Sequence, residues 1–259
     1  MTKSTLLFFI GLFSFSTAFS FADYYIDRVT GEQLGSDGSE TNNLRVIDIR
    51  EWNYVIEEKG GTNSAPGIRE LHKNSYVITF DENQIQKEIQ VMADDTMNEG
   101  LENQVFIVLN VNNGKIFALR DWEPELKTNK QIIINTYGVG PNSAPRVREG
   151  LMLLAQLHGH PKEKRDDKRN ITSVSELDAE VAKELGITIF AIDAFHSFDI
   201  SESKTFYNHS KALHIHSVTK EGMIKNFIGQ TFGKSGVNTF NFSNYFDTVL
   251  RTNKNSEVL

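Results

Sequence analysis

The chain contains no cysteine among its 259 residues. This absence excludes disulfide bonds, thiolate metal sites and a cysteine nucleophile. Positively charged residues are also outnumbered, since the chain has 27 Lys and Arg residues and 34 Asp and Glu residues. Nucleic acid, which binds clustered positive charge, is therefore not an expected partner, and a metal-dependent nuclease is disfavoured. Hydrophobic residues make up 39% and charged residues 24%, which is ordinary globular usage and excludes a disordered or collagen-like chain.

Long apolar runs are lacking, apart from one near the start of the chain. Lys3 precedes an apolar stretch over residues 6–15, and the small residues Ser20 and Ala22 follow it. This order predicts a secretory signal peptide over residues 1–22, cleaved after Ala22. The alternative is an uncleaved membrane anchor. Cleavage would leave 26 positive and 34 negative residues, a net charge of −8. We expect a secreted or periplasmic protein without a stable membrane span.

The remaining chain divides by composition into three parts. Residues 23–75 are rich in Gly, Ser, Asn and Thr, and form an N-terminal extension to which the sequence assigns no role. One or two strands are expected within residues 44–56. Residues 76–250 carry sharper hydrophobic patterns and are expected to form the main domain. Residues 251–259 are expected to be a polar tail.

In the main domain, segments with the hydrophobic pattern of strands are interspersed with segments that have helical spacing. A turn at 112–114 suggests that the second and third strands form a hairpin. The helix at 173–185 is expected to begin with a capping box of Ser173 and Glu176. These patterns together predict an α/β fold with a mixed β-sheet flanked by helices. The expected strands are 76–80, 104–109, 115–119, 130–135, 151–158, 187–195 and 211–218, and the expected helices are around 85–92, 173–185 and 221–228.

Two histidines stand at the end of a predicted buried strand, in the run His158-Gly159-His160-Pro161. Residues i and i+2 of a strand point to the same face, about 7 Å apart. Both imidazoles can therefore reach one metal ion, and Asp178 near the start of the following helix could add a carboxylate. Two imidazoles and one carboxylate suit zinc and leave one position open for water. Zinc-bound water loses a proton near neutral pH, and hydrolysis then needs a general base.

The residues 158–161, followed by the S-x-x-D motif at 175–178, resemble the JAMM (JAB/MPN) metalloprotease superfamily. The closest likeness is to JAB-like domains of secreted bacterial proteins, and it covers about residues 80–220. The resemblance implies a JAB/MPN-like sheet with the layering of cytidine deaminases. It also implies hydrolysis of a peptide or isopeptide bond, so a peptide or protein is the expected substrate.

The family motif carries over to individual residues of this chain. The resemblance implies that His158, His160 and Asp178 bind Zn²⁺, and that Ser175 hydrogen-bonds the reaction intermediate or the bound water. The family also has a catalytic glutamate before or at the first hairpin strand. Glu102 best fits this position, with Glu99 as the alternative.

The chain departs from the family pattern in one spacing. Seventeen residues separate His160 from Asp178, which is longer than is usual in the family, and Ile171 stands at the usual position of the aspartate. The extra length contains eight consecutive charged residues, 162–169, which predict a solvated loop or a flap over the site. Asp166 or Asp167, both in this loop, could replace Asp178 as a ligand.

Other interpretations remain open for several of these residues. Ser175 and Asp178 could simply cap a helix and complement its dipole. If the long spacing marks a lost site, the chain is an inactive JAB-like binding or scaffolding module. A second H-x-H, at 214–216, lies in an alternating strand where the histidines are expected on the polar side. His72 is isolated in the sequence. The aromatic residues of 240–246 are expected to pack in the core, and the sequence does not predict an oligomeric state.

Overall fold

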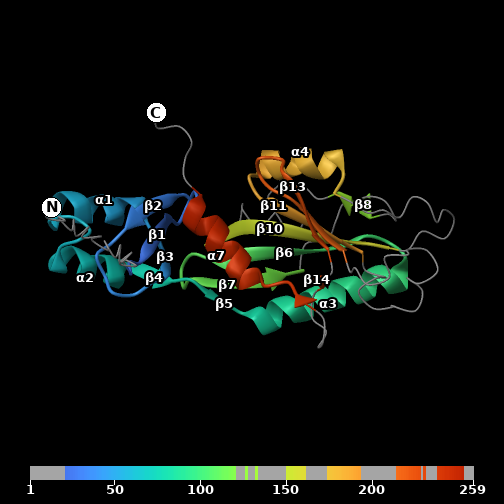
Figure 1. The fold of residues 1–259 in the computed structure, drawn as a ribbon, viewed down its shortest axis with the longest axis horizontal. Coiled ribbons are helices and arrows are strands. Elements are labelled where there is room, and N and C mark those ends of the chain that lie inside the picture. Colours follow the sequence, from blue (N-terminus) through green and yellow to red (C-terminus); the bar gives the residue numbers. More distant parts are fainter. Residues whose placement is uncertain are drawn as a thin grey trace, which may run out of the picture.

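The computed structural model shows a mixed α/β protein with two principal sheets and five helices in its described residues (Figure 1). Residues 1–20 of the predicted signal peptide and the whole charged loop 162–169 lie outside this part of the chain. The described residues are 21–120, 126–127, 132–133, 150–161, 174–193, 214–228, 230–231 and 238–253. None of the helices in these ranges is long and apolar enough to cross a membrane.

The elements alternate along the chain as the α/β prediction requires. The helices are α1 (Ile49–Glu58), α2 (Ala65–Asn74), α3 (Glu82–Glu99), α4 (Glu176–Leu185) and α7 (Phe242–Thr252). The strands of the N-terminal part are β1 (Tyr24–Asp27), β2 (Gln33–Ser36), β3 (Leu44–Ile47) and β4 (Ser75–Val77). The main sheet contains β5 (Thr79–Phe80), β6 (Asn103–Asn110), β7 (Lys115–Leu119), β10 (Leu151–His160), β11 (Thr188–Asp193), β12 (His214–Val218) and β13 (Ile224–Ile228). Four two-residue strands form two small sheets, β8 (Leu126–Lys127) with β9 (Ile132–Ile133), and β14 (Gln230–Thr231) with β15 (Asn238–Thr239).

The N-terminal extension is a folded α/β unit with a sheet in the order β2-β1-β3-β4. The strand expected within 44–56 is confirmed as β3, but the remainder of that range belongs to α1. Asp48 accepts a hydrogen bond from the backbone N–H of Arg50 and so caps α1. Trp52 and Val55, three positions apart, then face the same buried cluster. A local cap and helical spacing therefore override the strand prediction there.

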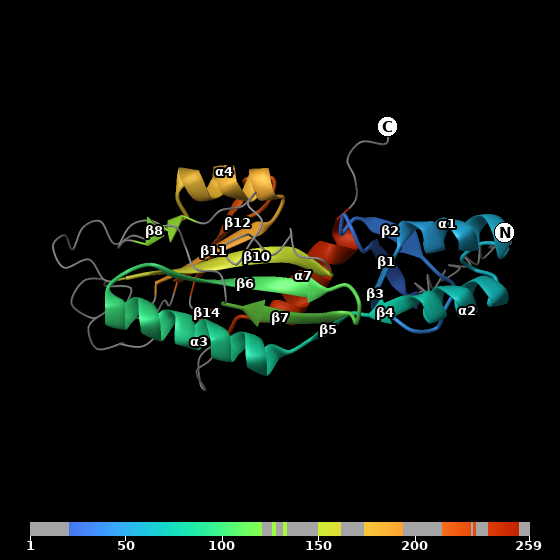
Figure 2. The ribbon, with the colours of Figure 1, turned by 180° about the vertical axis from the view of Figure 1, so that it is seen from behind.

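The main sheet has the order β13-β12-β11-β10-β6-β7-β5. Central strand β10 pairs in parallel with β11 and antiparallel with β6. Side chains of β6 alternate between the two faces. Val105, Ile107 and Leu109 join one core cluster, with residues of α3 and α7. Phe106 and Val108 join the other, with residues of α4. Figures 1 and 2 accordingly show α3 and α4 on opposite faces of the sheet.

The predicted strand 76–80 is split between the two sheets. Its first half belongs to β4 of the N-terminal unit and its second half is β5 at the edge of the main sheet. Between them, the N–H of Ile78 donates to the carbonyl of Leu44, and the N–H of Thr79 donates to that of Gly114. The chain thus passes directly from one sheet to the other without a linker.

Most other predicted elements of the main domain are confirmed, including the hairpin of β6 and β7 and the buried strand β10. The aromatic residues of 240–246 pack in the core, as expected. The helix predicted at 221–228 is wrong, because β13 pairs there with β12. The N–H of Gly222, a residue with φ +81°, donates to the carbonyl of Thr219 and forms a tight turn. This turn reverses the chain, so that β13 runs back antiparallel to β12. Of the predicted strand 130–135, the described residues form β9.

Candidate metal centre at the end of strand β10

Strand β10 brings His158 and His160 to one end of the main sheet, and Pro161 follows directly. Gly159 between them faces the opposite side. A Cβ added at Gly159 would lie 2.7 Å from Oγ1 of Thr96 and 3.1 Å from the sulfur of Met92, both on α3. Glycine is therefore required because α3 packs closely on that face. The close packing of α3 supports the strand end that carries the histidines.

The two imidazoles approach each other closely. Their Nε2 atoms are 3.2 Å apart, and their rings are tilted by 59° with centroids separated by 5.0 Å. Two nitrogen ligands of a tetrahedral zinc ion, each at 2.0–2.1 Å, would lie about 3.3 Å apart. The Nε2 pair therefore fits the spacing that a single metal ion requires.

His158 is held in a form that suits a metal ligand. Its side chain is 4% exposed, and burial lowers its pKa to about 4, although the charge of Asp178 acts in the opposite direction. The Oε1 atom of Gln156 lies 3.2 Å from Nδ1 of His158. The amide nitrogen of Gln156 in turn donates to Oε1 of Gln104. This chain of amides places a proton on Nδ1 and leaves the lone pair on Nε2, as in many histidine ligands.

Gln104 and Gln156 were not predicted as site residues. Both are buried, at 7% and 8% exposure, and they lie on adjacent strands. A sequence signal did exist, because a glutamine inside an otherwise apolar strand needs a buried hydrogen-bond partner. Only the register of β6 and β10 shows that His158 is close to both amides, since His158 pairs with Gln104.

Glu102 stands immediately before β6 and is 6% exposed. Burial raises its pKa to about 7, with His160 lowering the value and Asp178 raising it further. The structure thus places Glu102 within electrostatic reach of the predicted ligands. Glu99, the alternative, is exposed at the end of α3, where it accepts a hydrogen bond from the side chain of Asn103. Of these two carboxyl groups, Glu102 is the buried one.

Helix α4 begins later than predicted, at Glu176. The capping box is formed by Ser175 and Asp178, and the predicted box of Ser173 and Glu176 is wrong. Oγ of Ser175 accepts from the N–H of Asp178 at 3.1 Å, and Oδ2 of Asp178 accepts from the N–H of Ser175 at 2.6 Å. The Ser175 hydroxyl also donates to the same oxygen at 2.8 Å. The box thus uses aspartate in place of the usual glutamate at its third helical position, and it sets the start of α4 at Glu176. The capping interpretation of Ser175 and Asp178 is confirmed.

Several predicted alternatives fall outside the described residues. These are the charged loop 162–169 with Asp166 and Asp167, and Ile171. The second H-x-H is placed only through its backbone on β12, which β11 separates from β10.

A second group of side chains, in the N-terminal unit, could hold a metal ion. The ligand atoms of Asp23, Asp37 and His72 all lie within 4.8 Å of one another. Within the described residues, this is the group of three possible ligands whose atoms come this close together. The ligand atoms of His158, His160 and Asp178 are not all within that distance of one another. The sequence did not indicate this group, because His72 comes from α2 and the aspartates from two separate loop ends. Their assembly depends on the packing of α2 against the sheet.

Protein donors already engage the carboxylates of this second group. Oδ1 of Asp23 accepts from the side chain of Thr41 at 2.7 Å, and its Oδ2 pairs with Arg45. Oδ2 of Asp37 accepts from the hydroxyl of Tyr25 at 2.7 Å. A metal ion would have to compete with these hydrogen bonds. The group is therefore explained at least as well by a polar network whose hydrogen bonds are satisfied as by a metal centre.

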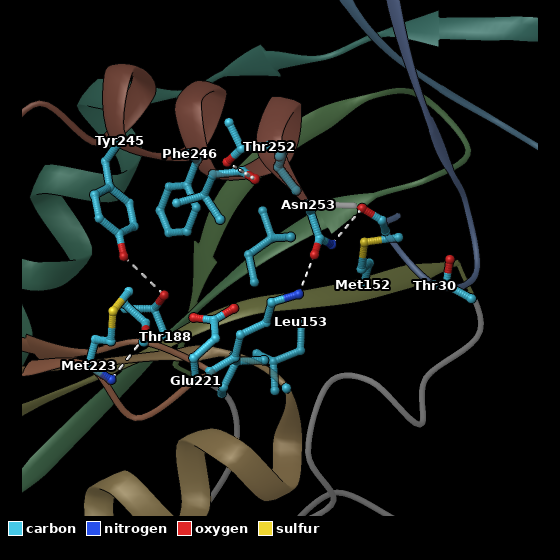
Figure 3. Close-up of a pocket in the computed structure, with 18 of the residues that line it drawn as sticks. Thr30, Met152, Leu153, Thr188, Glu221, Met223, Tyr245, Phe246, Thr252 and Asn253 are labelled. Atoms are coloured by element: carbon cyan, nitrogen blue, oxygen red, sulfur yellow. Dashed lines mark hydrogen bonds between the residues drawn. The ribbon is translucent and has the colours of Figure 1, made fainter. Parts of the chain in front are cut away.

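A cavity of about 320 Å³ lies at the other end of β10, beneath α7 (Figure 3). Several of its polar side chains are paired with protein groups: the hydroxyl of Tyr245 lies 3.0 Å from that of Thr188, and Asn253 contacts both Lys220 and the carbonyl of Gly31. The cavity also lies away from the histidines, since it borders residues 152–154 of the strand. It therefore adds nothing to the candidate metal centre.

Comparison with known proteins gives no independent assignment. No protein-family model matches the chain, and no curated protein sequence matches it either.

Proposed function

We propose that this chain is an exported metal-dependent hydrolase that cuts a peptide or isopeptide bond. The observation that carries the proposal is the pair of imidazole Nε2 atoms 3.2 Å apart at the end of β10, close to the buried carboxyl of Glu102. A neutral, buried His158 with His160 beside it, close to a carboxyl group with a pKa near 7, is the combination that water activation requires.

His158, His160 and Asp178 would hold the ion, and Zn²⁺ suits two imidazoles and a carboxylate. Once bound, zinc would supply a water of lowered pKa and would polarise the carbonyl of the scissile bond. The amide of Gln156 keeps Nε2 of His158 available, because it occupies Nδ1. As a ligand, Asp178 would offer Oδ1, since Oδ2 accepts two hydrogen bonds from Ser175.

Glu102 would act as the general base and then return the proton to the leaving amine. Without a metal, burial raises the pKa of Glu102 to about 7, and a bound cation would favour the carboxylate form, which is the form that accepts a proton from water. Its burial excludes bulk water from this exchange. Ser175 would orient the reacting water or the intermediate through its hydroxyl.

The order of elements supports membership of the JAMM (JAB/MPN) superfamily. Helix α3 precedes the hairpin of β6 and β7, strand β10 carries H-x-H, and the capped helix α4 leads to the parallel strand β11. This is the order of elements that the resemblance implies. The glutamate, the histidines and the aspartate all come from one end of these elements, although they are far apart in sequence.

The test measures zinc content and peptide hydrolysis of the exported protein and three variants. Asp178→Asn should reduce the bound zinc, because it removes a charged ligand. Glu102→Gln should keep the zinc and abolish turnover, because an amide cannot accept the proton. Glu99→Gln is the matched control and should be active. Full activity of Glu102→Gln together with inactivity of Glu99→Gln would instead assign the base to Glu99.

The second candidate is an inactive JAB-like binding or scaffolding module. The capping contacts favour it, because Ser175 holds Oδ2 of Asp178 at the helix start, and the long spacing to His160 is consistent with a lost site. In this case the purified protein contains no metal, and chelator leaves its melting temperature unchanged. His158→Ala would then not change metal content, whereas the hydrolase should lose its zinc.

A further inference from the structure

Asp23 begins the N-terminal unit with its backbone nitrogen in a buried polar site. Its N–H donates to Oδ1 of Asp37 and to the hydroxyl of Ser39, each at 3.1 Å. Asp23 is 0% exposed and Asp37 is 3% exposed. One backbone N–H thus meets two acceptors, one of which is a buried carboxylate from a loop fourteen residues away.

The charges around this nitrogen are unbalanced. Burial raises the pKa of Asp37, but hydrogen bonds from Ser39, Tyr25 and the backbone of Asp23 outweigh burial and leave the pKa below its usual value. The pKa of Asp23 is lowered in the same way, against burial, by Thr41, Arg45 and Asn43. Two carboxylates are therefore ionised beside one permanent cation, the guanidinium of Arg45.

The remaining group that faces the carboxylates is His72, which contributes charge only when it is protonated. Its Nε2 lies 3.2 Å from Asp37 and 3.4 Å from Asp23. With His72 neutral, the cluster keeps an excess negative charge in a buried place, which is unfavourable unless a further cation compensates for it.

We propose that Asp37 and Ser39 form a binding site for the N-terminal ammonium group of Asp23, generated when an endopeptidase hydrolyses the Ala22–Asp23 peptide bond. Water adds across this bond. The Ala22 carbonyl leaves as a carboxylate with the preceding segment, and the Asp23 nitrogen takes the protons and becomes an ammonium group. One neutral donor is thereby replaced by three charged donors at the same position.

The new ammonium balances the second carboxylate of the cluster. It stands at hydrogen-bond distance from Oδ1 of Asp37 without any movement of the chain, and charge-assisted bonds of this kind are the stronger ones. The folded unit therefore favours the processed chain over the unprocessed one. The inference does not depend on the hydrolase proposal, because the N-terminal unit is remote from the histidines of β10.

The first test is the mass of the protein after export of the full chain from a bacterial host. The expected product begins at Asp23. A mature chain beginning at any other residue would overturn the proposal.

The second test compares two chains that begin at Ala22 and at Asp23, both prepared with a protease that leaves no extra residue. In the presence of chelator, which removes any metal contribution, the Asp23 chain should melt about 2–4 °C higher. Asp37→Asn should remove this difference. Asp48→Asn, which changes another carboxylate of the same unit, should keep it. Equal melting temperatures of the two unsubstituted chains would contradict the proposal.

The third test needs no substitution. An amine-acylating reagent should modify the α-amine of the Asp23 chain more slowly in the folded protein than in urea, because Asp37 and Ser39 occupy its protons. Peptide mapping separates this amine from the lysines. Equal rates in the two states would show that the ammonium is not bound.

Discussion

At the scale of single residues, burial acts in opposite directions on two neighbouring titratable groups. It raises the pKa of Glu102 to about 7 and lowers that of His158 to about 4. Both shifts have the same physical cause, because a buried site disfavours the charged form of either group. Without a metal, the site therefore prefers a neutral carboxyl group and a neutral imidazole. A bound cation would reverse this preference for the carboxyl group.

Glu102→Gln should stabilise the metal-free protein at high pH. The folded pKa of Glu102 lies above that of the unfolded chain, so its contribution to stability is present below about pH 4.5 and is lost as the pH rises to about 7. The variant cannot ionise, so at pH 8 it should be more stable by about 2–3 kcal/mol. Urea unfolding at pH 8 and pH 4 in chelator measures this.

A second pH and a control variant make this result interpretable. At pH 4 the Glu102→Gln variant should match the parent protein, because both carry a neutral group there. Glu99→Gln, on the exposed end of α3, should have no comparable effect at pH 8. An unchanged unfolding midpoint of Glu102→Gln at pH 8 would mean that Glu102 is not buried as a carboxyl group.

At the scale of elements, α4 serves two purposes that the sequence could not separate. Ser175 and Asp178 satisfy the free N–H groups at the helix start, and the negative charge of Asp178 acts on His158 and Glu102. The capping role of these two residues is therefore observed, whereas a ligand role for Asp178 remains part of the proposal. Variants that keep the cap but change the hydroxyl can separate them.

Ser175→Ala should lower the free energy of unfolding by about 1 kcal/mol, because the N–H of Asp178 loses its acceptor. Ser175→Asn should restore most of this stability, since asparagine caps helices equally well. If the hydroxyl also takes part in hydrolysis, Ser175→Asn should be stable and yet slow. Denaturant unfolding together with peptide hydrolysis distinguishes the roles, and full activity of Ser175→Asn would limit Ser175 to capping.

At the scale of the whole molecule, the two sheets share one hydrophobic cluster. Ile26 and Val46 of the N-terminal unit belong to the same cluster as Phe246 and Leu250 of α7 and the inner residues of β6. Figure 1 shows α7 between the N-terminal unit and the main sheet. The direct passage of the chain at Ile78 adds a covalent and hydrogen-bonded connection. Neither unit can therefore lose its core without exposing apolar surface of the other.

The two units should consequently unfold in a single transition. Hydrogen exchange followed by mass spectrometry in increasing urea should show peptides of β1 and β3 losing protection at the same midpoint as peptides of β6 and β10. Val46→Ala should lower both midpoints together. Two separate midpoints, or a shift confined to β1 and β3, would show that the N-terminal unit is an independent domain.

The sequence by itself determined the local features of this protein. Dense apolar runs located β6 and β10, because a strand buried on both faces needs apolar residues throughout. The turn at 112–114 indicated the returning strand β7, and helical spacing located α3. The pair His158 and His160 could also be found locally, since two residues of one strand share a face without help from elsewhere. At residues 221–228 the sequence predicts a helix, whereas the structure contains strand β13, which pairs with β12.

Only the tertiary structure decided which distant residues meet. The register of β6 and β10 brings Gln104 to His158, α2 brings His72 to Asp23 and Asp37, and burial gives Glu102 its raised pKa. These effects depend on contacts between segments tens of residues apart, whose pairing is decided by packing of the whole core and leaves no periodic trace in the sequence. The same packing places the nitrogen of Asp23 beside a buried carboxylate.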